Sequence, residues 1–507
     1  MSERLDLPTI LGEGDPAFVS ALIAKGETFR YRDENGYTAI VHAVCGRDVA
    51  RDPRLLDLLR VLVGAGVDLN SVTKYHESAL RILSRIGRFD AVQLLIEAGA
   101  DRGHLGWNPL IEAAALGSAV EIERLVLNGA PLEATDYWGR TPWLVALLAG
   151  RLTAARLLRD LGANLDARGR CKAPPLHYAV LGHQPEVVRF LLEIGQDIEQ
   201  KDEFGATALM GAVADQDIEC ARLLIAAGAD VNVENGSGHV LGEATSPEMV
   251  RLLLRAGANP RYLAQAGHRA LCALGPALNR VTGVNREDFE RARTRRFGQN
   301  NPERMDEPFW ESMIRSGASA YDARVAFKAE GQAEAVPTWS AMRFGQSITP
   351  LPDGRVVQIA GEHEDHYDPD FCIYNDVFVH SPDGGITIYG YPKTVFPPTD
   401  FHTATLLNDA IYVIGSLGYH GDRRFGQTQV YRLDLATFRM DQVRTWGDAP
   451  GWIHEHVAVL ISPAEIRVSG GTVAIEIAGK EEHRENRDTF ILNTRTNAWQ
   501  RAPQVTH

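Results

Sequence analysis

The first half of the chain repeats one pattern of apolar and polar positions. An apolar segment with helical spacing is followed by Gly, a small residue, Asp or Asn and a further apolar residue, as in residues 223–231 (Leu-Leu-Ile-Ala-Ala-Gly-Ala-Asp-Val). The glycine recurs at steps of 33, 30, 33, 33, 33 and 29 residues, at Gly66, Gly99, Gly129, Gly162, Gly195, Gly228 and Gly257. A period this regular predicts a stack of small helical units rather than one globular core.

A second pattern belongs to the same units. Residues 136–143 (Asp-Tyr-Trp-Gly-Arg-Thr-Pro-Trp) have related copies at 33–39 and 202–209, and Pro-Pro-Leu-His-Tyr-Ala at 174–179 fits the same place. These motifs resemble the ankyrin repeat, in which Asp-x-x-Gly-x-Thr-Pro-Leu leads from a hairpin into the first helix. The resemblance covers about residues 33–262.

The resemblance implies an α-solenoid of about seven repeats at residues 33–275, which follows an N-terminal cap at 1–32. Three repeats depart from the pattern. Residues 48–53 are inserted between the helices of the first repeat, the second repeat has no turn glycine near Tyr75, and the last repeat is shortened near residues 235–239.

Two residue types in the hairpins have a predicted local role. Glycine adopts the positive φ of a tight turn at little cost, at Gly36, Gly139 and Gly205. Threonine can cap the first helix through its hydroxyl, at Thr38, Thr141 and Thr207.

The second half of the chain has a different texture. Residues 276–336 are interpreted as a helical connector, because the segments 286–293 and 307–314 space their apolar residues for one helix face. From 337 to 507, short runs of Val, Ile, Tyr and Thr between turn residues predict antiparallel β-structure. The predicted fold class is therefore multidomain α + β, with an α-solenoid, a connector and a β domain.

The β domain also repeats. Apolar strands ending in glycine stand 54 and 55 residues apart, at Gly361, Gly415 and Gly470, and a further strand and a late Trp499 follow. This pattern resembles the kelch repeat of β-propellers and implies about three blade-like repeats. Known propellers close with about four to eight blades, so the domain is expected to borrow a sheet, pair with another chain or form an open arc.

Composition narrows the class of partner and the compartment. The formal net charge of −14 argues against a nucleic acid or an anionic membrane as the main partner. We expect no signal peptide, no membrane span and a cytoplasmic location, because the chain starts with acids and lacks a run of about 20 apolar residues. The cysteines are expected to be reduced, buried small hydrophobes, at Cys45, Cys171, Cys220, Cys272 and Cys372.

Candidate chemistry is sparse. In the cluster at 362–370, His363, Asp365 and His366 could hold a metal ion, although we interpret it as a polar loop of an acidic protein. His402 and His456 occupy positions where kelch blades carry a structural histidine, which the resemblance implies here too. No nucleotide-binding or nucleophile motif is present, so no cofactor and no enzymatic activity are expected. A metal-dependent enzyme that uses the β domain is the alternative.

The resemblance therefore favours a scaffold that binds another protein through the concave ankyrin face. A sharper hypothesis is a bacterial inhibitor or immunity-type protein that covers a basic target, and the β domain offers a place for self-association. Trp, Tyr and Arg dominate the energetic centres of interfaces, although the rings could also pack on neighbouring hairpins. The predicted contact residues are Glu34, Asn35, Tyr37, Trp107, Tyr137, Trp138, Arg140, Glu203 and Phe204.

Overall fold

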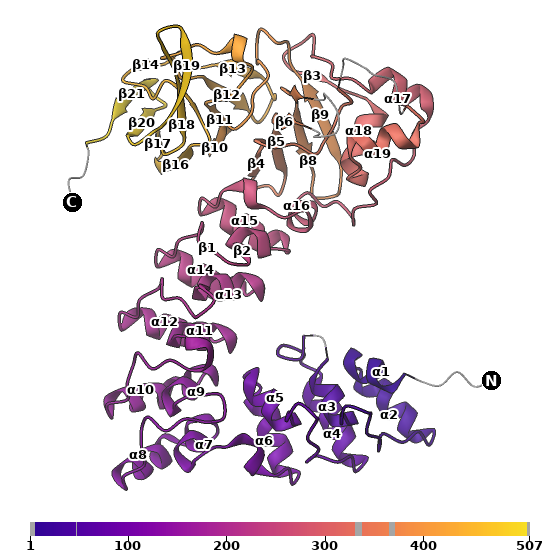
Figure 1. Ribbon diagram of the computed structural model, residues 1–507, viewed down its shortest axis with the longest axis vertical. Helices are drawn as coiled ribbons and strands as arrows, with labels where there is room; N and C mark the ends of the chain where they lie inside the picture. The colour runs from indigo at the N-terminus through magenta and orange to yellow at the C-terminus, as the bar shows by residue number, and fades with distance from the viewer. Residues whose placement is uncertain (1–5, 47, 330–336, 365–370, 504–507) are drawn as a thin grey trace. The chain divides into compact units, whose positions relative to one another are not determined.

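The computed structural model describes residues 6–46, 48–329, 337–364 and 371–503. These residues form two compact units, 1–240 and 241–507, and each is described by itself. The first unit is helical, and the second combines helices with several antiparallel sheets (Figure 1). Helices thus precede most strands along the chain, which confirms the predicted order of a helical region followed by a β-rich region.

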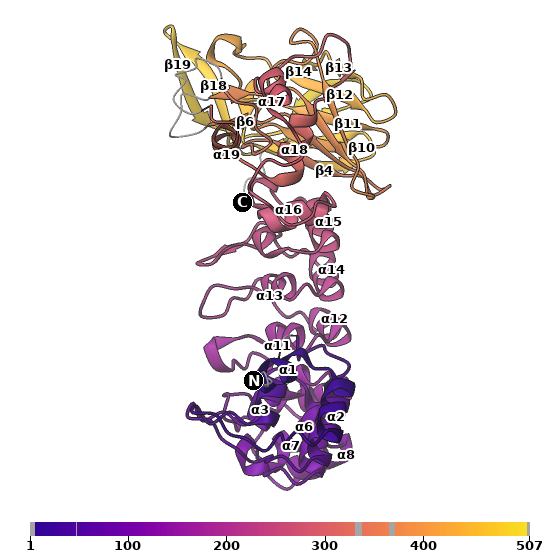
Figure 2. The same cartoon turned by 90° about the vertical axis from the view of Figure 1, so that its right-hand side faces the viewer.

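The first unit is built from pairs of short antiparallel helices. The first helices of the pairs lie on the side from which the hairpins project, and the second helices α12 and α14 lie on the other side (Figure 2). The helices are α1 (Leu7–Glu13), α2 (Pro16–Ala24), α3 (Ala39–Val44), α4 (Leu55–Gly64), α5 (Ala79–Arg85), α6 (Phe89–Glu97), α7 (Pro109–Ala115), α8 (Ala119–Leu127), α9 (Pro142–Leu148), α10 (Leu152–Asp160), α11 (Pro175–Leu181), α12 (Pro185–Glu193), α13 (Ala208–Ala214) and α14 (Ile218–Ala226).

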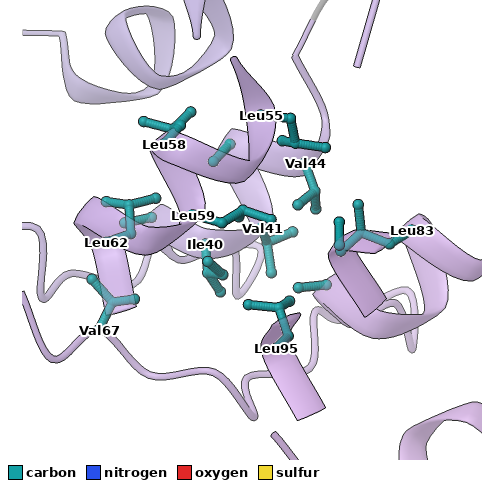
Figure 3. Packing of buried hydrophobic residues seen from close by; sticks show 14 of the residues in the cluster. Ile40, Val41, Val44, Leu55, Leu58, Leu59, Leu62, Val67, Leu83 and Leu95 are labelled. Carbon is teal, nitrogen blue, oxygen red and sulfur yellow. The ribbon is translucent and has the colours of Figure 1, made fainter. Parts of the chain in front are cut away.

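The core of the first repeats follows from helical spacing. In α4, Leu55, Leu58, Leu59 and Leu62 recur at steps of three and four residues and are all buried. In Figure 3 Leu59 lies beside Ile40 and Val41 of α3, and Val41 is at the centre of the cluster. A helix with such a stripe cannot bury it alone, so each repeat needs a neighbour.

The stack of repeats changes between the pair α5/α6 and the pair α7/α8. Among the described residues, first helices pack in the series α1, α3, α5 and then in the series α7, α9, α11, α13. At the junction a short 3-10 helix, η1 (Arg102–Leu105), packs on α5. The turn after α5 lies close to later repeats. A Cβ added at Gly87 would lie only 3.2 Å from Leu148 Cδ1 and 3.5 Å from Gly182 Cα.

The inserted segment of the first repeat supports this arrangement. Arg51 lies in the insertion, and its Nε donates a hydrogen bond to Nε2 of His183, 3.1 Å away in the turn between α11 and α12. His183 Nδ1 also lies 3.0 Å from the Asp217 carboxylate. Helix α9 packs against α7, α10 and α11 and is buried at all seven positions, whereas a solenoid helix normally keeps one face in water.

The predicted helix caps are correct at two of three sites. The Thr141 and Thr207 hydroxyls accept hydrogen bonds from backbone N–H groups three residues on, at 3.4 Å in each case. The prediction for Thr38 is wrong, because its hydroxyl instead bonds that of Ser71 at 2.6 Å. The cysteines are free thiols, but Cys45 is exposed and Cys171 is half-buried, so burial was wrongly predicted for those two.

Helices of the second unit flank its β-structure. Helix α15 packs on the first strand of the β region, and α17 to α19 form a cluster over the first sheet, in which Trp310 stacks on Trp339 at 4.9 Å between ring centroids. The segments interpreted as connector helices are indeed helical. The bounds are α15 (Pro247–Arg255), α16 (Gln265–Leu271), α17 (Arg286–Ala292), α18 (Pro308–Ser316) and α19 (Ala320–Ala326).

In the described part of the chain, three sheets each contain an antiparallel meander, in which the second strand lies between the first and third. Apolar clusters separate the first sheet from the second and the second from the third. The first sheet contains β4 (Ser347–Pro350), β5 (Val356–Ile359), β8 (Val377–His380), β9 (Ile386–Gly390) and β3 (Glu303–Arg304). The second contains β10 (Thr403–Leu407), β11 (Ala410–Ile414), β12 (Val430–Asp434) and β13 (Met440–Gln442). The third contains β16 (Val457–Ser462), β17 (Glu465–Ser469), β20 (Thr489–Asn493), β21 (Ala498–Arg501) and β14 (Trp446–Gly447).

Smaller sheets complete the chain. A hairpin inserted in the third meander pairs β18 (Thr472–Ile477) with β19 (Lys480–Glu485), and β15 (Trp452–His454) lies beside β18. Two further pairs are β1 (Glu234–Asn235) with β2 (Gly238–His239) and β6 (Glu362–His363) with β7 (Cys372–Ile373). The β texture is thereby confirmed, while the kelch resemblance stays a prediction.

Candidate partner-binding site

The hairpins of the first unit share one turn. In three of them an aspartate, Asp33, Asp136 or Asp202, accepts hydrogen bonds through Oδ1 from the N–H groups two and four residues on. Thr73 Oγ1 does the same in the second repeat. The fourth residue of the turn has positive φ, whether it is Gly36, His76, Gly139, Lys172 or Gly205. The missing turn glycine is therefore replaced by His76, at φ 61°.

The hairpins are joined to one another through the backbone. The N–H of Lys74 donates to the Asn35 carbonyl at 2.9 Å, and the N–H of Arg170 donates to the Trp138 carbonyl at 3.1 Å. The N–H of Glu203 donates to the Cys171 carbonyl at 2.8 Å. Because both partners are backbone groups, the side chains at the tips are free to vary.

Most of the predicted contact residues are accessible. Tyr137 and Phe204 are 55% and 65% exposed, and Glu34 and Glu203 are exposed. Asn35, Tyr37 and Trp107 are half-buried. Burial raises the pKa of the Tyr37 hydroxyl above its ordinary value, so this group stays a neutral hydrogen-bonding group.

Two predicted contacts are corrected. Arg140 is 2% exposed, and it lies inside the molecule because its guanidinium binds Asp136 at 2.6 Å and the Ser84 carbonyl at 2.7 Å. Trp138 is 7% exposed and lies between the guanidinium groups of Arg85 and Arg170, which are 5.5 and 4.9 Å from its ring centroid. Neither residue offers its side chain freely to a partner.

A shallow depression adjoins these residues. It has a volume of about 460 Å³ and is lined by Tyr137, Trp138, Gly139, Arg168, Gly169 and Arg170; we call these residues the central tip surface. Arg168 is held in place, because its guanidinium donates to the carbonyls of Lys172 and Lys201 at 2.9 and 3.0 Å. Arg81 covers one face of Tyr137 at 4.3 Å and leaves the rest of the ring exposed.

Several exposed residues of the tips were not predicted from the sequence. Tyr75 is 65% exposed and stands two residues after Thr73, as Phe204 stands two residues after Asp202. Counting from the threonine that replaces the hairpin aspartate would have found it. Arg170 stands one residue after Gly169, as Tyr137 stands one residue after Asp136, and counting from this glycine would have found it.

The β region holds the other candidate residues. His363 is buried, and its Nδ1 lies 3.2 Å from the Met342 carbonyl, whereas Asp365 and His366 lie outside the described residues. Nearby, burial together with Asp400 and Glu364 raises the pKa of Glu362 to about 7. In the part of the chain that the structure describes, no group of three or more His, Cys, Asp or Glu side chains is arranged to hold a metal ion.

His402 and His456 join successive sheets. His402 Nε2 lies 2.8 Å from Ser347 Oγ on the sheet before it, and His456 Nε2 lies 2.8 Å from Thr403 Oγ1. Burial lowers the pKa of each histidine to about 3, so both are neutral near pH 7.

Within the described ranges, no helix is long and apolar enough to cross a membrane.

The model of the family described as "Ankyrin repeats (3 copies)" matches residues 121–202 and 176–264. The ankyrin repeat protein YahD of Escherichia coli (strain K12) is 30% identical over 156 residues, which cover 29% of this chain and 74% of that protein. The chain is an ankyrin-repeat protein.

Two other relatives match this ankyrin-repeat protein over a similar length. The B-cell lymphoma 3 protein homolog of Mus musculus is 32% identical over 154 residues, which are 29% of the chain and 34% of that protein. The neurogenic locus notch homolog protein 1 of Xenopus laevis is 28% identical over 142 residues, which are 26% of the chain and 6% of that protein. The chain therefore spans about a third of the mouse protein and a small part of the frog protein.

Proposed function

We propose that this ankyrin-repeat protein binds a partner protein through its hairpin tips, centred on the central tip surface. The observation that carries the proposal is the exposed Tyr137 ring beside the exposed Arg170, at the rim of a depression of about 460 Å³. Tyr and Arg are enriched among the residues whose truncation costs an interface most. Ankyrin repeats generally act as protein-binding modules, which supports the same function.

The charge of the tips points to the chemistry of the partner. The charged residues that line the depression are cations, Arg168 and Arg170, and both are exposed. The acidity of the whole chain favoured a basic target, but a partner meets the local charge first. We therefore propose that the bound segment of the partner is acidic and carries an apolar or aromatic group for the depression.

The test is affinity capture from the source cells, with the full chain as bait and mass spectrometry as the readout. The variant Tyr137→Ala with Arg170→Ala should recover at least about tenfold less of the partner, because two central contacts are lost. The matched control is Leu127→Ala with Arg124→Ala on α8, which removes one exposed apolar residue and one exposed arginine away from the hairpins. Equal recovery by the wild type and the tip variant would overturn the proposal.

Two finer hypotheses belong to this proposal. An inhibitor or immunity-type role predicts that the captured partner is an enzyme or a toxin whose activity falls when the chain is added. We also propose that the β region carries a contact between two copies of the chain. The two contacts are separate, since the tip surface and the β strands lie in different units.

A further inference from the structure

The hairpin inserted in the third meander, β18 with β19, has a narrow attachment to the rest of the β region. Strand β15 pairs with β18 through three residue pairs, from Trp452–Ala474 to His454–Thr472. Strand β19 pairs with the other side of β18 and reads Lys-Glu-Glu-His-Arg-Glu, which is charged or titratable at every position. The hairpin lies at the margin of the β region in Figure 2. Its attachment therefore depends on β15 and on the polar side chains of β19.

A cluster of polar side chains joins β19 to β15 and to the 3-10 helix η5 (His420–Asp422). Glu481 and His483 alternate along β19 and therefore share one face. His454 Nε2 on β15 lies 3.1 Å from His483 Nδ1, and His483 Nε2 lies 2.7 Å from Glu481 Oε1. Glu481 also forms an ion pair with Arg423 and lies 2.9 Å from Nε2 of His420. We call these five residues, His420, Arg423, His454, Glu481 and His483, the hairpin cluster.

The centre of the hairpin cluster is largely closed to water. His454 is 6% exposed, and the side chains of Glu481 and Arg423 are 10% and 11% exposed. The Arg423 guanidinium is held in place, because it donates to the carbonyls of Leu417 and Gly418 at 2.9 and 3.0 Å. The loop after β11 therefore holds the hairpin through Glu481.

The contact between His454 and His483 can carry one added proton but not two. One of the two facing ring nitrogens must donate and the other must accept. If His483 alone is a cation, it donates both to His454 and to Glu481, and the cluster keeps its hydrogen bonds. If both rings are cations, two N–H groups face each other across 3.1 Å, and the hydrogen bond is replaced by repulsion.

The other charged groups around His454 do not compensate for a second proton. Glu455 Oε2 lies 3.9 Å from His454 Nδ1, but that side chain is 43% exposed and is screened by water. Glu476 lies opposite Glu481 in the register and is also exposed. Burial, His483 and Arg423 lower the pKa of His454 from 6.5 to about 4. The contribution of His454 to the closed hairpin is therefore fully present above pH 6.5 and is lost as the pH falls toward 4.

We infer that the β18–β19 hairpin is a pH-sensitive element that separates from β15 when His454 and His483 are both protonated. In the closed state β18 covers β15, and Trp452 is 2% exposed. The Trp452 indole donates to the Leu417 carbonyl at 3.0 Å, so β15 stays attached to the loop after β11 when the hairpin leaves. Separation then uncovers the Trp452 ring and the backbone groups of β15 that pair with β18. Acid thus creates an edge strand that is absent from the closed state.

Hydrogen–deuterium exchange of the full chain at pH 7, 6 and 5, corrected for the intrinsic exchange rate at each pH, tests the inference. Protection of residues 472–485 should fall at least about tenfold from pH 7 to pH 5. In His454→Gln this fall should disappear, because glutamine can donate to His483 without titrating. The matched control His456→Gln removes a buried histidine that contacts Thr403 instead, and the fall should remain. A fall that persists in His454→Gln, or that His456→Gln abolishes, would overturn the inference.

A second variant covers the case in which His454→Gln fails to fold. Glu481→Gln removes the carboxylate that binds Arg423 and His483, so the hairpin should lose at pH 7 about as much protection as the wild type loses at pH 5. The matched control is Glu482→Gln, at the next position of β19, where the exposed carboxylate pairs with Arg484 and faces away from the cluster. Protection of residues 472–485 at pH 7 that is the same in Glu481→Gln as in the wild type counts against the inference.

Discussion

The two repeated regions of this ankyrin-repeat protein are joined in different ways. Successive hairpins of the solenoid are connected by backbone hydrogen bonds, such as that from the Arg170 N–H to the Trp138 carbonyl at 3.1 Å. Successive sheets of the β region are connected by side chains, such as His456 and the Thr403 hydroxyl at 2.8 Å. The first kind of contact is available to almost any residue, whereas the second requires two particular residues.

This difference explains how much each region varies in sequence. A backbone connection accepts His76 or Lys172 where other hairpins have glycine, provided that the turn keeps its positive φ. A side-chain connection needs a histidine and a hydroxyl, so the sequence changes where the series of connected sheets ends. Gln346 stands in place of the histidine before the first sheet, and Val457 stands in place of the hydroxyl on the third. The residue at a connecting position therefore does not show whether two hairpins are joined. In the β region it does show which sheets are the first and the last of the series.

Arg140 breaks this comparison and gives the largest expected effect. It is a side-chain connection inside the solenoid, since its guanidinium bridges Asp136 and Ser84 in the buried interior. Arg140→Ala leaves the Asp136 carboxylate buried without its cation and should lower the free energy of unfolding by about 3–5 kcal/mol. Urea denaturation followed by tryptophan fluorescence measures this loss.

The control for that prediction is Arg170→Ala, which removes an exposed arginine from the same part of the solenoid. Its effect should stay within about 1 kcal/mol, because the side chain is exposed and its main contact is with the Trp138 ring. A loss below about 1 kcal/mol for Arg140→Ala would mean that the contact with Ser84 does not hold the second repeat against the fourth.

The histidine connections should make the β region sensitive to acid. Burial lowers the pKa of His402 and of His456 to about 3, against about 6.5 in the unfolded chain. Their contribution is fully present above pH 6.5 and is lost as the pH falls toward the folded pKa, because the unfolded chain then binds more protons. The loss should approach about 1.4 kcal/mol per pH unit for each histidine, and unfolding by urea at pH 7, 6 and 5 measures it.

His456→Gln isolates the effect, since glutamine can donate to the Thr403 hydroxyl without titrating. The difference between wild type and variant is the proper measure, because Glu362 acts in the opposite sense. Its pKa is raised to about 7, so its contribution is present below pH 4.5 and is lost as the pH rises through 7. Parallel pH profiles for wild type and His456→Gln would contradict the assigned role of the histidine.

The features that depend on residues close together in sequence could be predicted. The glycine period, the hairpin motif and the helical spacing of the connector depend on neighbours a few residues apart, and the corresponding helices are found, such as α17 and α18. The β texture after residue 337 was found for the same reason. The two-residue strand β3 was missed because so short a segment has no period of its own.

The turn of the second repeat back toward later repeats could not be predicted in this way. Arg140 and Ser84 are 56 residues apart in sequence, and no local pattern around either residue predicts their contact. One signal was present: α9 reads Pro-Trp-Leu-Val-Ala-Leu-Leu and has no polar position, which indicates a helix covered on every side. Arg140 and Trp138 were expected to be exposed because the tips of a regular solenoid face solvent. They are buried because the second repeat lies close to later repeats.

The smallest expected effect is on the stability of a single hairpin turn, the one that contains Lys172. Lys172 has a φ of 54°, where glycine stands in related hairpins, and its side chain is exposed. Lys172→Gly relieves left-handed strain of about 1–2 kcal/mol and adds about 0.5–1 kcal/mol of backbone entropy to the unfolded chain. The net result should be a gain of about 0.5 kcal/mol in the free energy of unfolding, measured by urea denaturation.

Arg170→Gly is the matched control, because it changes a neighbouring exposed residue whose φ is not positive. It gains no relief of strain and should lose about 1–2 kcal/mol, from backbone entropy and from the contact of the guanidinium with the Trp138 ring. The backbone hydrogen bond from residue 170 to the Trp138 carbonyl is available to glycine as well, so neither variant loses a backbone hydrogen bond between hairpins. Equal losses at both positions would mean that the hairpins depend on side-chain contacts, and the distinction between the two kinds of connection would fail in the solenoid.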